Sequence, residues 1–485
     1  MWSKDLRAPP ETKRTTVRYS VPHFRVHCRA MRSNEQQDLP RREAIVFLFV
    51  ATVMVALLQG LFYQMPKPAL DALRYIDYAL NIHDHAVFGL SGTRRDAIPA
   101  PGYANSPMYP ALVAVAASLD TGLEASLRCA VTDKHLAGAE CPGQFGVLVV
   151  IQNGLIIIGL FCLWATARLL FRRSLVAWLA CALALASTKP LFFANNLVTE
   201  ILVLALFPLL MLGLVLASKR GCRWWPITGI VLGLMTLTRP EYLYLAYAFA
   251  LVGVCMWVWG RRRQTGTALL LSLLAFFAVV GPWMARNNHH FGHFAVTGGY
   301  GDVIFAYRSA YNRMSVAEWA AAFVYWLPGH GETLAAKMLP QTSYAKLGTD
   351  PASYLYTDGS EVFERGLAAV NGDRDRLFAY LIRTEVLAHP VKHALVSVPL
   401  AWRGILAGKY LAVPGVPCLA ILLIVAARRG EWRFPALVLP AMIMVALYAA
   451  VSVSIPRYNV YLIYYYAIAT AWAMVSLLER RRFGL

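Results

Sequence analysis

Two acidic residues, Asp71 and Asp77, lie in the segment DALRYIDYALNI, which follows the first long apolar run of the sequence. If this segment is helical, Asp71, Tyr75, Ala79 and Ile82 share one face, whereas Asp77 points elsewhere. A carboxylate in such a place can act as the general base that deprotonates an acceptor hydroxyl or amine. The alternative is an acid at a helix start that has no part in chemistry.

A third acid, Glu200, opens the apolar run in NNLVTEILVLALF. We expect Glu200 on the same side as Asp71, where two carboxylates from separate loops would supply a base and a group that positions the acceptor or binds a metal. Alternatively, Glu200 is solvated or favourably placed at a helix N-terminus. Whether Asp71, Asp77 and Glu200 together bind a divalent cation stays open.

Several cations lie at the ends of apolar runs, on the same side as these acids: Arg239, Arg286, Arg457, Lys189 and Lys409. An arginine offers two parallel donors to phosphate oxygens, so a phosphorylated lipid with its headgroup at this level is the expected partner. The alternative is that each arginine extends to water or pairs with Glu200 or Glu241.

Histidines and cysteines give no signal for a metal centre. Five of the eleven histidines stand in two short clusters, which are His83 and His85 around Asp84, and His289, His290 and His293. They lack the HExxH spacing, and the eight cysteines lack a CxxC pair. Cys129 and Cys141 both fall in a polar stretch that the topology places outside, where a disulfide can persist. Their pairing stays open.

The elements that position these residues are membrane helices. The 485 residues are 58% hydrophobic and 15% charged, against roughly 45–50% and 25% in soluble domains. Apolar runs of about 18–25 residues are long enough to cross a hydrocarbon core of about 30 Å. We predict about ten spans, at 44–63, 145–170, 174–190, 198–217, 226–239, 242–259, 266–285, 409–427, 434–454 and 458–478.

The net charge of +19 mostly reflects the orientation of the protein in the membrane. Every second connection between the spans is basic, as the positive-inside rule requires of cytosolic loops. These loops carry Arg172 and Arg173, Lys219, Arg220 and Arg223, Arg261 to Arg263, Arg428, Arg429 and Arg433, and Arg480 to Arg482. Both termini are therefore predicted to be cytosolic, and a nucleic-acid partner is not expected.

The remaining polar sequence divides the chain. We expect a disordered basic tail at 1–43 without a signal peptide, an N-terminal transmembrane module at 44–285 and C-terminal transmembrane helices at 394–485. The first external loop is 65–144, with short amphipathic helices, and a large external loop is 286–393. Large loops on one side favour an enzyme at the outer interface over a simple transporter.

Six motifs carry a resemblance to a known family. In order they are DALRYIDYALNI, VIQNGLIIIGLFCLWATARLLF, NNLVTEILVLALF, GLMTLTRPEYL, GPWMARNNHHFG and PRYNVYLIYYY. Their order and topology resemble the integral-membrane glycosyltransferases of the GT-C class, which use polyprenyl-phosphate sugars. The nearest relatives are bacterial members related to lipid A aminoarabinose transferase, lipopolysaccharide-core sugar transferases and protein O-mannosyltransferases.

The resemblance implies an all-α polytopic GT-C fold in the inner membrane, with the active site on the periplasmic side. It implies transfer of a sugar from polyprenyl phosphate to lipid A, another envelope polysaccharide or a protein. By position Asp71 is the base and Glu200 shapes the acceptor site, while Arg239, Arg286 and Arg457 are candidates for the donor phosphate. Because the loop HDHAVFGLSG departs from the family pattern, Asp77 remains a rival base.

Two other classes of function compete with this interpretation. A flippase or transporter of a phosphorylated lipid-linked sugar would use the same arginines to hold a phosphate in transit. A non-catalytic partner in envelope assembly would tolerate loss of Asp71 and Glu200. The sequence names neither the sugar nor the acceptor, whose recognition we expect in the loop 286–393.

Overall fold

The structure is a computed structural model of the chain, and it describes residues 39–482 except 69, 92–96, 133–140, 260–261, 299 and 350. Within these residues every regular element is helical, in agreement with the predicted all-α fold. Most of the predicted tail at 1–43 lies outside the described residues. Its last residues, 41–43, already belong to the first helix.

The helices of the N-terminal half are α1 (Arg41–Phe62), α2 (Asp71–His85), α3 (Met108–Leu119), α4 (Thr121–Ala130), α6 (Gly146–Phe171), α7 (Ser174–Ala186), α8 (Lys189–Ala194), α9 (Glu200–Arg220), α10 (Trp225–Thr238), α11 (Tyr242–Trp259) and α12 (Arg262–Phe291). Those of the C-terminal half are α13 (Gly301–Ala310), α14 (Val316–Tyr325), α15 (Gly331–Ala335), α16 (Gln341–Lys346), α17 (Gly359–Ala369), α18 (Arg374–Leu381), α19 (Pro390–Ile405), α20 (Ala412–Arg428), α21 (Arg433–Val451) and α22 (Leu462–Arg482).

Among the described residues, seven helical segments are long and apolar enough to cross a membrane. They are α1, α6, α9, α12 from Gly266, the joined segment Pro390–Arg428, α21, and α22 as far as Glu479. The other three predicted spans, at 174–190, 226–239 and 242–259, correspond to the shorter apolar helices α7, α10 and α11. Each predicted span is thus a helix, although α12 continues to Phe291, beyond the predicted boundary at 285.

One end of the bundle joins the first and last helices. Glu43 at the start of α1 contacts Arg168 near the end of α6, at 3.2 Å, and Ser174 at the start of α7. Arg173 pairs with Glu479 near the end of α22, at 2.6 Å. We call this the basic end. Because α1 and α7 start there while α6 and α22 end there, these neighbouring helices run antiparallel.

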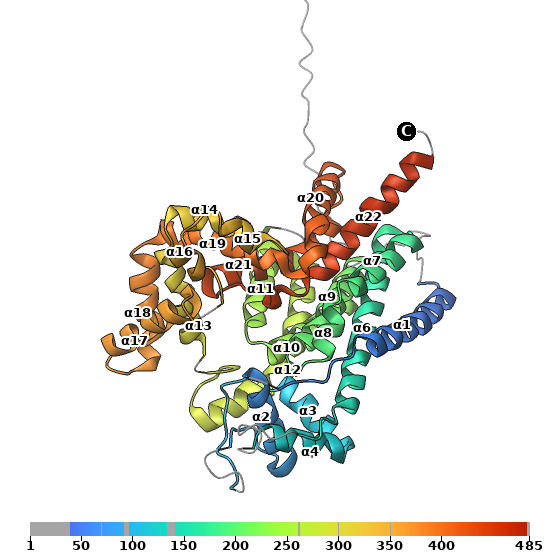
Figure 1. Ribbon diagram of the computed structural model, residues 1–485. Helices are drawn as coiled ribbons and strands as arrows, with labels where there is room; N and C mark the ends of the chain where they lie inside the picture. The colour runs from blue at the N-terminus through green and yellow to red at the C-terminus, as the bar shows by residue number, and fades with distance from the viewer. Residues whose placement is uncertain are drawn as a thin grey trace, which may run out of the picture.

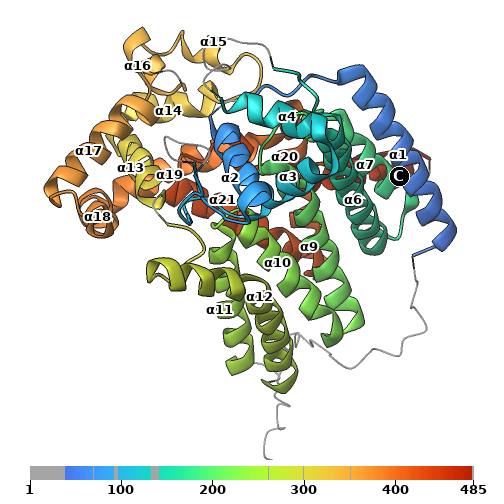
Figure 2. The ribbon, with the colours of Figure 1, turned by 90° about the horizontal axis from the view of Figure 1, so that it is seen from below.

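Close helix contacts form the centre of the bundle, where α9 and α10 lie between α6 and α12 (Figure 2). A Cβ atom on Gly159 of α6 would lie 2.5 Å from the carbonyl oxygen of Leu204 in α9, and one on Gly229 of α10 would lie 2.0 Å from that of Ser272 in α12. Small residues let helix backbones approach this closely in a membrane. Tyr464 of α22 donates to the same Leu204 carbonyl at 2.8 Å, which ties the last helix to this contact.

The predicted loop 286–393 is largely a folded helical unit, α13 to α18, which lies to the left in Figures 1 and 2. The fully buried Arg308 of α13 attaches this unit to the membrane helices. Its guanidinium donates to the carbonyl of Ala449 at the end of α21 (2.6 Å) and to that of His393 in α19 (3.0 Å). It also donates to the hydroxyl of Ser397 (2.8 Å), and burial lowers its pKa to about 9.

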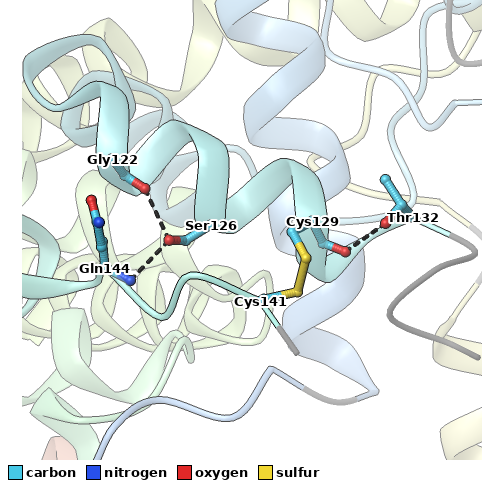
Figure 3. The surroundings of a disulfide bond; sticks show 6 residues. All are labelled: Gly122, Ser126, Cys129, Thr132, Cys141 and Gln144. Atoms are coloured by element: carbon cyan, nitrogen blue, oxygen red, sulfur yellow. Dashed lines mark hydrogen bonds between the residues drawn. A yellow bond between two sulfur atoms is a disulfide. The ribbon is translucent and has the colours of Figure 1, made fainter. Parts of the chain in front are cut away.

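The first loop contains α2, α3 and α4, which Figure 1 shows at the bottom, away from the C-terminus. The chain after α4 is fixed to it by a disulfide between Cys129 and Cys141, the pairing that the sequence left open. Beside the disulfide, the Ser126 hydroxyl donates to the Gly122 carbonyl and accepts from the backbone N–H of Gln144 (Figure 3). Whereas α2 and α4 are amphipathic, as predicted, α3 is apolar because it packs among α2, α4, α6 and α10.

Candidate functional site

Asp71, the first residue of α2, lies against Arg457, which is 386 residues further along the chain. Nη2 of Arg457 donates to Oδ2 of Asp71 at 3.0 Å. Arg457 belongs to a short helical turn, η6 (Pro456–Asn459), just before α22. The two side chains are 45% and 43% exposed, so a ligand can reach this ion pair from the solvent.

Glu200, the first residue of α9, is buried beside this pair. Its Oε1 lies 3.5 Å from Nε of Arg457 and 3.4 Å from Nη1 of Arg239. Nη2 of Arg239 lies 3.4 Å from Oε1 of Glu241. We call Asp71, Glu200, Arg239, Glu241 and Arg457 the charge cluster. Three carboxylates and two guanidinium groups give it a formal charge of −1.

Arg239 is placed by the proline that follows it. The residue before a proline avoids helical backbone angles, and Arg239 is extended, with φ −146° and ψ 119°, so α10 ends at Thr238. Its side chain is only 9% exposed and lies 4.7 Å from the ring centre of Tyr458. Two carboxylates and this ring satisfy the buried guanidinium. The alternative that the sequence left open for this arginine, pairing with Glu200 and Glu241, is the observed arrangement.

Two tyrosines surround the cluster. Tyr75 lies one turn after Asp71 and packs its ring 5.5 Å from that of Tyr109. Burial, and then the charge of Asp71, raise the pKa of the Tyr75 hydroxyl. The ring of Tyr458 lies beside both guanidinium groups of the cluster. The four-residue spacing of Asp71 and Tyr75 predicts their shared face. Tyr458 stands in the sequence motif PRYNVYLIYYY, but its place beside Arg239 depends on the tertiary fold.

Asp77 lies on another face of α2 and holds the loop that follows this helix. Its Oδ2 accepts from the backbone N–H of Ser91 at 2.9 Å, and its Oδ1 accepts from the Ser91 hydroxyl at 2.8 Å. Asn81 adds a bond to the Gly89 carbonyl at 2.8 Å. Asp77 is therefore a loop anchor and is not part of the charge cluster.

Arg286 also contacts the first loop instead of the cluster. Its Nη1 donates to the Gly102 carbonyl at 2.7 Å, and its Nη2 donates to the Phe88 carbonyl at 3.1 Å. Its guanidinium lies 4.8 Å from the ring centre of Trp283 in α12. The side chain thus ties both ends of the 88–102 segment to α12. Its predicted contact with a donor phosphate stays a prediction.

Lys189 lies outside the charge cluster as well. Its amine lies 5.2 Å from the ring centre of Phe192. Phe192 lines a pocket of about 530 Å³ with Lys67 and with Gln64, Met65, Asn195 and Asn196. The predicted role of Lys189 in phosphate binding remains a prediction.

The described acids do not form the divalent site that the sequence left open, because Arg457 lies between Asp71 and Glu200 while Asp77 holds Ser91. Elsewhere in the described chain, possible ligand atoms of His83, Asp84 and Glu124 lie within 4.8 Å of one another. Arg128 already engages both of these carboxylates, at 2.6 and 2.8 Å. Its hydrogen bond lowers the pKa of Asp84 to about 2, so an arginine supplies the positive charge there.

Backbone strain occurs close to the predicted site residues. Seven described non-glycine residues have a positive φ angle, and three of them, Ala86, Arg172 and Asn371, lie away from the predicted site residues. The other four are Leu70 (49°), Thr188 (56°), Lys409 (48°) and Ser454 (44°), each of which is a predicted cation or lies within three residues of Asp71, Lys189 or Arg457. Such angles cost about 1–3 kcal/mol each and cluster at functional sites.

Residues 144–285 match the family described as dolichyl-phosphate-mannose-protein mannosyltransferase. The match runs from the start of α6 into α12, so it includes Glu200 and Arg239, whereas Asp71, Arg286 and Arg457 lie outside it. No curated protein matches the chain.

Two solved structures of one protein are similar to this chain. ArnT from Cupriavidus metallidurans bound to undecaprenyl phosphate is 12% identical, with 89% of this chain and 76% of that chain covered and a TM-score of 0.35. The apo state of the same protein is 12% identical, with 89% and 77% covered and a TM-score of 0.34. The match of residues 144–285 to the mannosyltransferase family agrees with the GT-C glycosyltransferase class that the order of the sequence motifs predicts.

Proposed function

We propose that this membrane protein transfers a sugar from a polyprenyl-phosphate donor to an acceptor of the cell envelope. The observation that carries the proposal is the charge cluster, in which Asp71, Glu200, Arg239 and Arg457 meet from four separate segments. These segments adjoin apolar helices, so a phosphate borne by a membrane lipid can reach Arg457 while the acceptor approaches from water. The half-exposed Asp71 and Arg457 supply a base and a phosphate ligand side by side.

The site lies, in this proposal, on the periplasmic face of the inner membrane. The basic end of the bundle, with Arg168 and Arg173, is then cytosolic by the positive-inside rule. Because α1 begins and α22 finishes there, both termini are cytosolic. The disulfide between Cys129 and Cys141 supports the assignment, because disulfides persist on the oxidising side of a membrane.

Each member of the charge cluster has a role in the proposed reaction. Asp71 takes the proton of the acceptor O–H or N–H group while the acceptor atom forms a bond to the anomeric carbon. The bond from that carbon to the phosphate oxygen breaks, and its electron pair stays on the phosphate, so the anomeric centre inverts. Arg457 binds the phosphate, and Glu200 holds Arg457 and Arg239 in place.

The acceptor is proposed to be lipid A, another envelope glycan or a protein, and the sugar a hexose or pentose. We place recognition of the acceptor in α13 to α18, because this unit adjoins the membrane helices through Arg308. Arg286 and Lys189 remain secondary candidates for contact with the donor phosphate.

The test is transfer by purified protein in lipid nanodiscs. A panel of radiolabelled polyprenyl-phosphate sugars is supplied together with an envelope fraction, and label in the acceptors is measured. We expect transfer from one donor, and a loss of about 10²–10⁴-fold in Asp71→Asn, which removes the general base. Asp77→Asn is the matched control on the same helix, and it should retain transfer because Asp77 only holds Ser91.

Three results would contradict the proposal or one of its assignments. Full activity in Asp71→Asn would remove the base assignment, and loss in Asp77→Asn alone, with folding intact, would move it to the rival acid. In proteoliposomes, movement of the labelled lipid across the bilayer with no transfer would favour a transporter of lipid-linked sugars.

A further inference from the structure

We propose that Arg457 couples the two ends of the reaction. It is held by Asp71 before the reaction, is released when that carboxylate takes the acceptor's proton, and moves to the phosphate of the departing carrier. The inference rests on the proposed function. It assigns to one guanidinium the task of linking proton acceptance at the base with departure of the leaving group.

The contacts of Arg457 permit this exchange. Asp71 and Glu200 are contacted through different nitrogens, Nη2 and Nε. Within the described residues, the hydrogen bond from the Nη atoms of Arg457 goes to Asp71. A guanidinium carries five N–H donors. Loss of the Asp71 contact therefore frees Nη2 and Nη1 together, as a fork suited to phosphate, while Nε stays beside Glu200.

Glu200 gives this movement a fixed point. Its carboxylate is 4% exposed, and it is also engaged by the buried Arg239, at 3.4 Å. The side chain of Arg457 is 43% exposed, against 9% for Arg239, so Arg457 is the arginine with room to change partner. We infer a rotation of the Arg457 side chain about its Nε contact, which needs no movement of η6 or α22.

Charge balance drives the exchange. The charge cluster is −1, and the donor, a phosphodiester, is also −1, whereas the released polyprenyl phosphate is a monoester that carries about −1.5 to −2 at pH 7. As the acceptor's proton reaches Asp71, the cluster becomes neutral. The attraction between Arg457 and Asp71 therefore falls while negative charge grows on the phosphate. As a result, the guanidinium moves from Asp71 to the phosphate.

The coupling makes a prediction that a simple phosphate site does not make. Asp71→Asn mimics the protonated acid, so it should release Arg457 and tighten binding of polyprenyl phosphate although it slows transfer by about 10²–10⁴-fold. A partly exposed ion pair contributes up to about 1 kcal/mol, so the expected gain in affinity is about three- to fivefold. Binding of the carrier as its methyl phosphodiester should gain less, because that ligand carries a single negative charge.

The experiment measures the Kd of both lipids for full-length protein in neutral nanodiscs by displacement of a radiolabelled carrier. The proteins are wild type, Asp71→Asn, Arg457→Gln, Arg457→Lys and the control Asp77→Asn. We expect Arg457→Gln to bind polyprenyl phosphate at least about tenfold more weakly, as loss of a charge-assisted pair implies. Arg457→Lys should recover part of the affinity, and Asp77→Asn should bind as wild type does.

The outcomes separate the two proposals. If Arg457→Gln binds weakly but Asp71→Asn binds no more tightly than wild type, the coupling is overturned while the phosphate role of Arg457 stands. If Arg457→Gln and Arg457→Lys both bind like wild type, the phosphate assignment in the proposed function fails and the coupling fails with it. Tighter binding in Asp71→Asn that persists in the double variant with Arg457→Gln would also overturn the coupling, because the gain would not pass through Arg457.

Discussion

Glu200 holds the centre of the charge cluster because it contacts both arginines. One buried carboxylate thus shares its negative charge between two guanidinium groups. Each arginine has a second acidic partner, which is Glu241 for Arg239 and Asp71 for Arg457. Burying charge in this way is tolerated only while every partner is present. The energetic consequences of a substitution should therefore differ sharply between the central acid and the lateral ones.

We predict that Glu200→Gln lowers the free energy of unfolding by about 3–5 kcal/mol, the range for removal of one partner from a buried pair. Glu241→Gln is the matched control. Its side chain is 31% exposed, against 4% for Glu200, and its ion pair in the described chain is the one with Arg239, so a change below about 1 kcal/mol is expected. Thermal unfolding in one detergent, followed by intrinsic fluorescence, measures both. Equal melting of Glu200→Gln and wild type would show that the buried contact with the arginines contributes little.

At the residue scale, the sequence predicts the positions that matter better than it predicts their partners. The spacing of Asp71 and Tyr75 predicts a common face, and Asp77 was correctly placed on another. However, the pairing of Asp71 with Arg457 spans 386 residues, and no local pattern specifies such a contact. The hydrogen bonds of Arg286 to loop carbonyls are not predicted for the same reason, since every residue has a backbone carbonyl and the sequence does not mark the one that accepts.

Among the elements, the first loop depends on a covalent link. The disulfide between Cys129 and Cys141 joins the end of α4 to the segment that enters α6. Four further cysteines whose side chains the structure describes, at positions 162, 181, 255 and 418, are unpaired. A disulfide that closes a loop of this size, at a sequence separation of 12, stabilises a fold by about 3 kcal/mol.

We therefore predict that Cys129→Ser with Cys141→Ser loosens α4 and the adjoining chain. Limited proteolysis should cleave the double variant faster than wild type between residues 120 and 145, while cleavage near α17 stays unchanged. Reductant should speed cleavage of wild type and leave the variant unaffected. Cleavage of the variant at the wild-type rate would mean that the packing of Ser126 on Gly122 and Gln144 is sufficient.

Hydropathy was a good guide to the elements and a poor guide to their lengths. Each predicted span is a helix, since a run of apolar residues in a membrane must satisfy its backbone internally. Yet α7 and α10 are short, because Thr188 and Pro240 follow closely and change the backbone direction. The sequence also places amphipathic helices in the external loops without locating them within 286–393, where the structure has the helices α13 to α18.

For the whole molecule, the junction between the helical unit α13 to α18 and the membrane helices rests on Arg308. Its four contacts include no carboxylate, and they are made to the backbone at Ala449 and His393 and to the side chains of Ser397 and Asn312. A backbone acceptor has a fixed place in space, so these bonds set the orientation of the unit as well as its attachment.

We predict that Arg308→Met weakens this junction by about 2–4 kcal/mol, since two buried carbonyls lose their donor. Arg313→Gln is the control in the same unit. It removes two solvent-accessible ion pairs, with Asp358 and Glu361, and should cost less than about 1 kcal/mol. Hydrogen exchange of α13 and α19 checks the difference. Faster exchange in Arg313→Gln than in Arg308→Met would contradict the assigned junction.

The span of the contact between Asp71 and Arg457 has a consequence for biosynthesis. Membrane helices are inserted in the order in which the ribosome supplies them, so α2, α9 and α10 are in place long before η6 is made. A nascent chain that ends before residue 456 holds three acids of the charge cluster and only Arg239, with a formal charge of −2. The phosphate site that we propose therefore comes into existence with the last helix, and a chain cut short during translation carries the acids without the arginine that completes them.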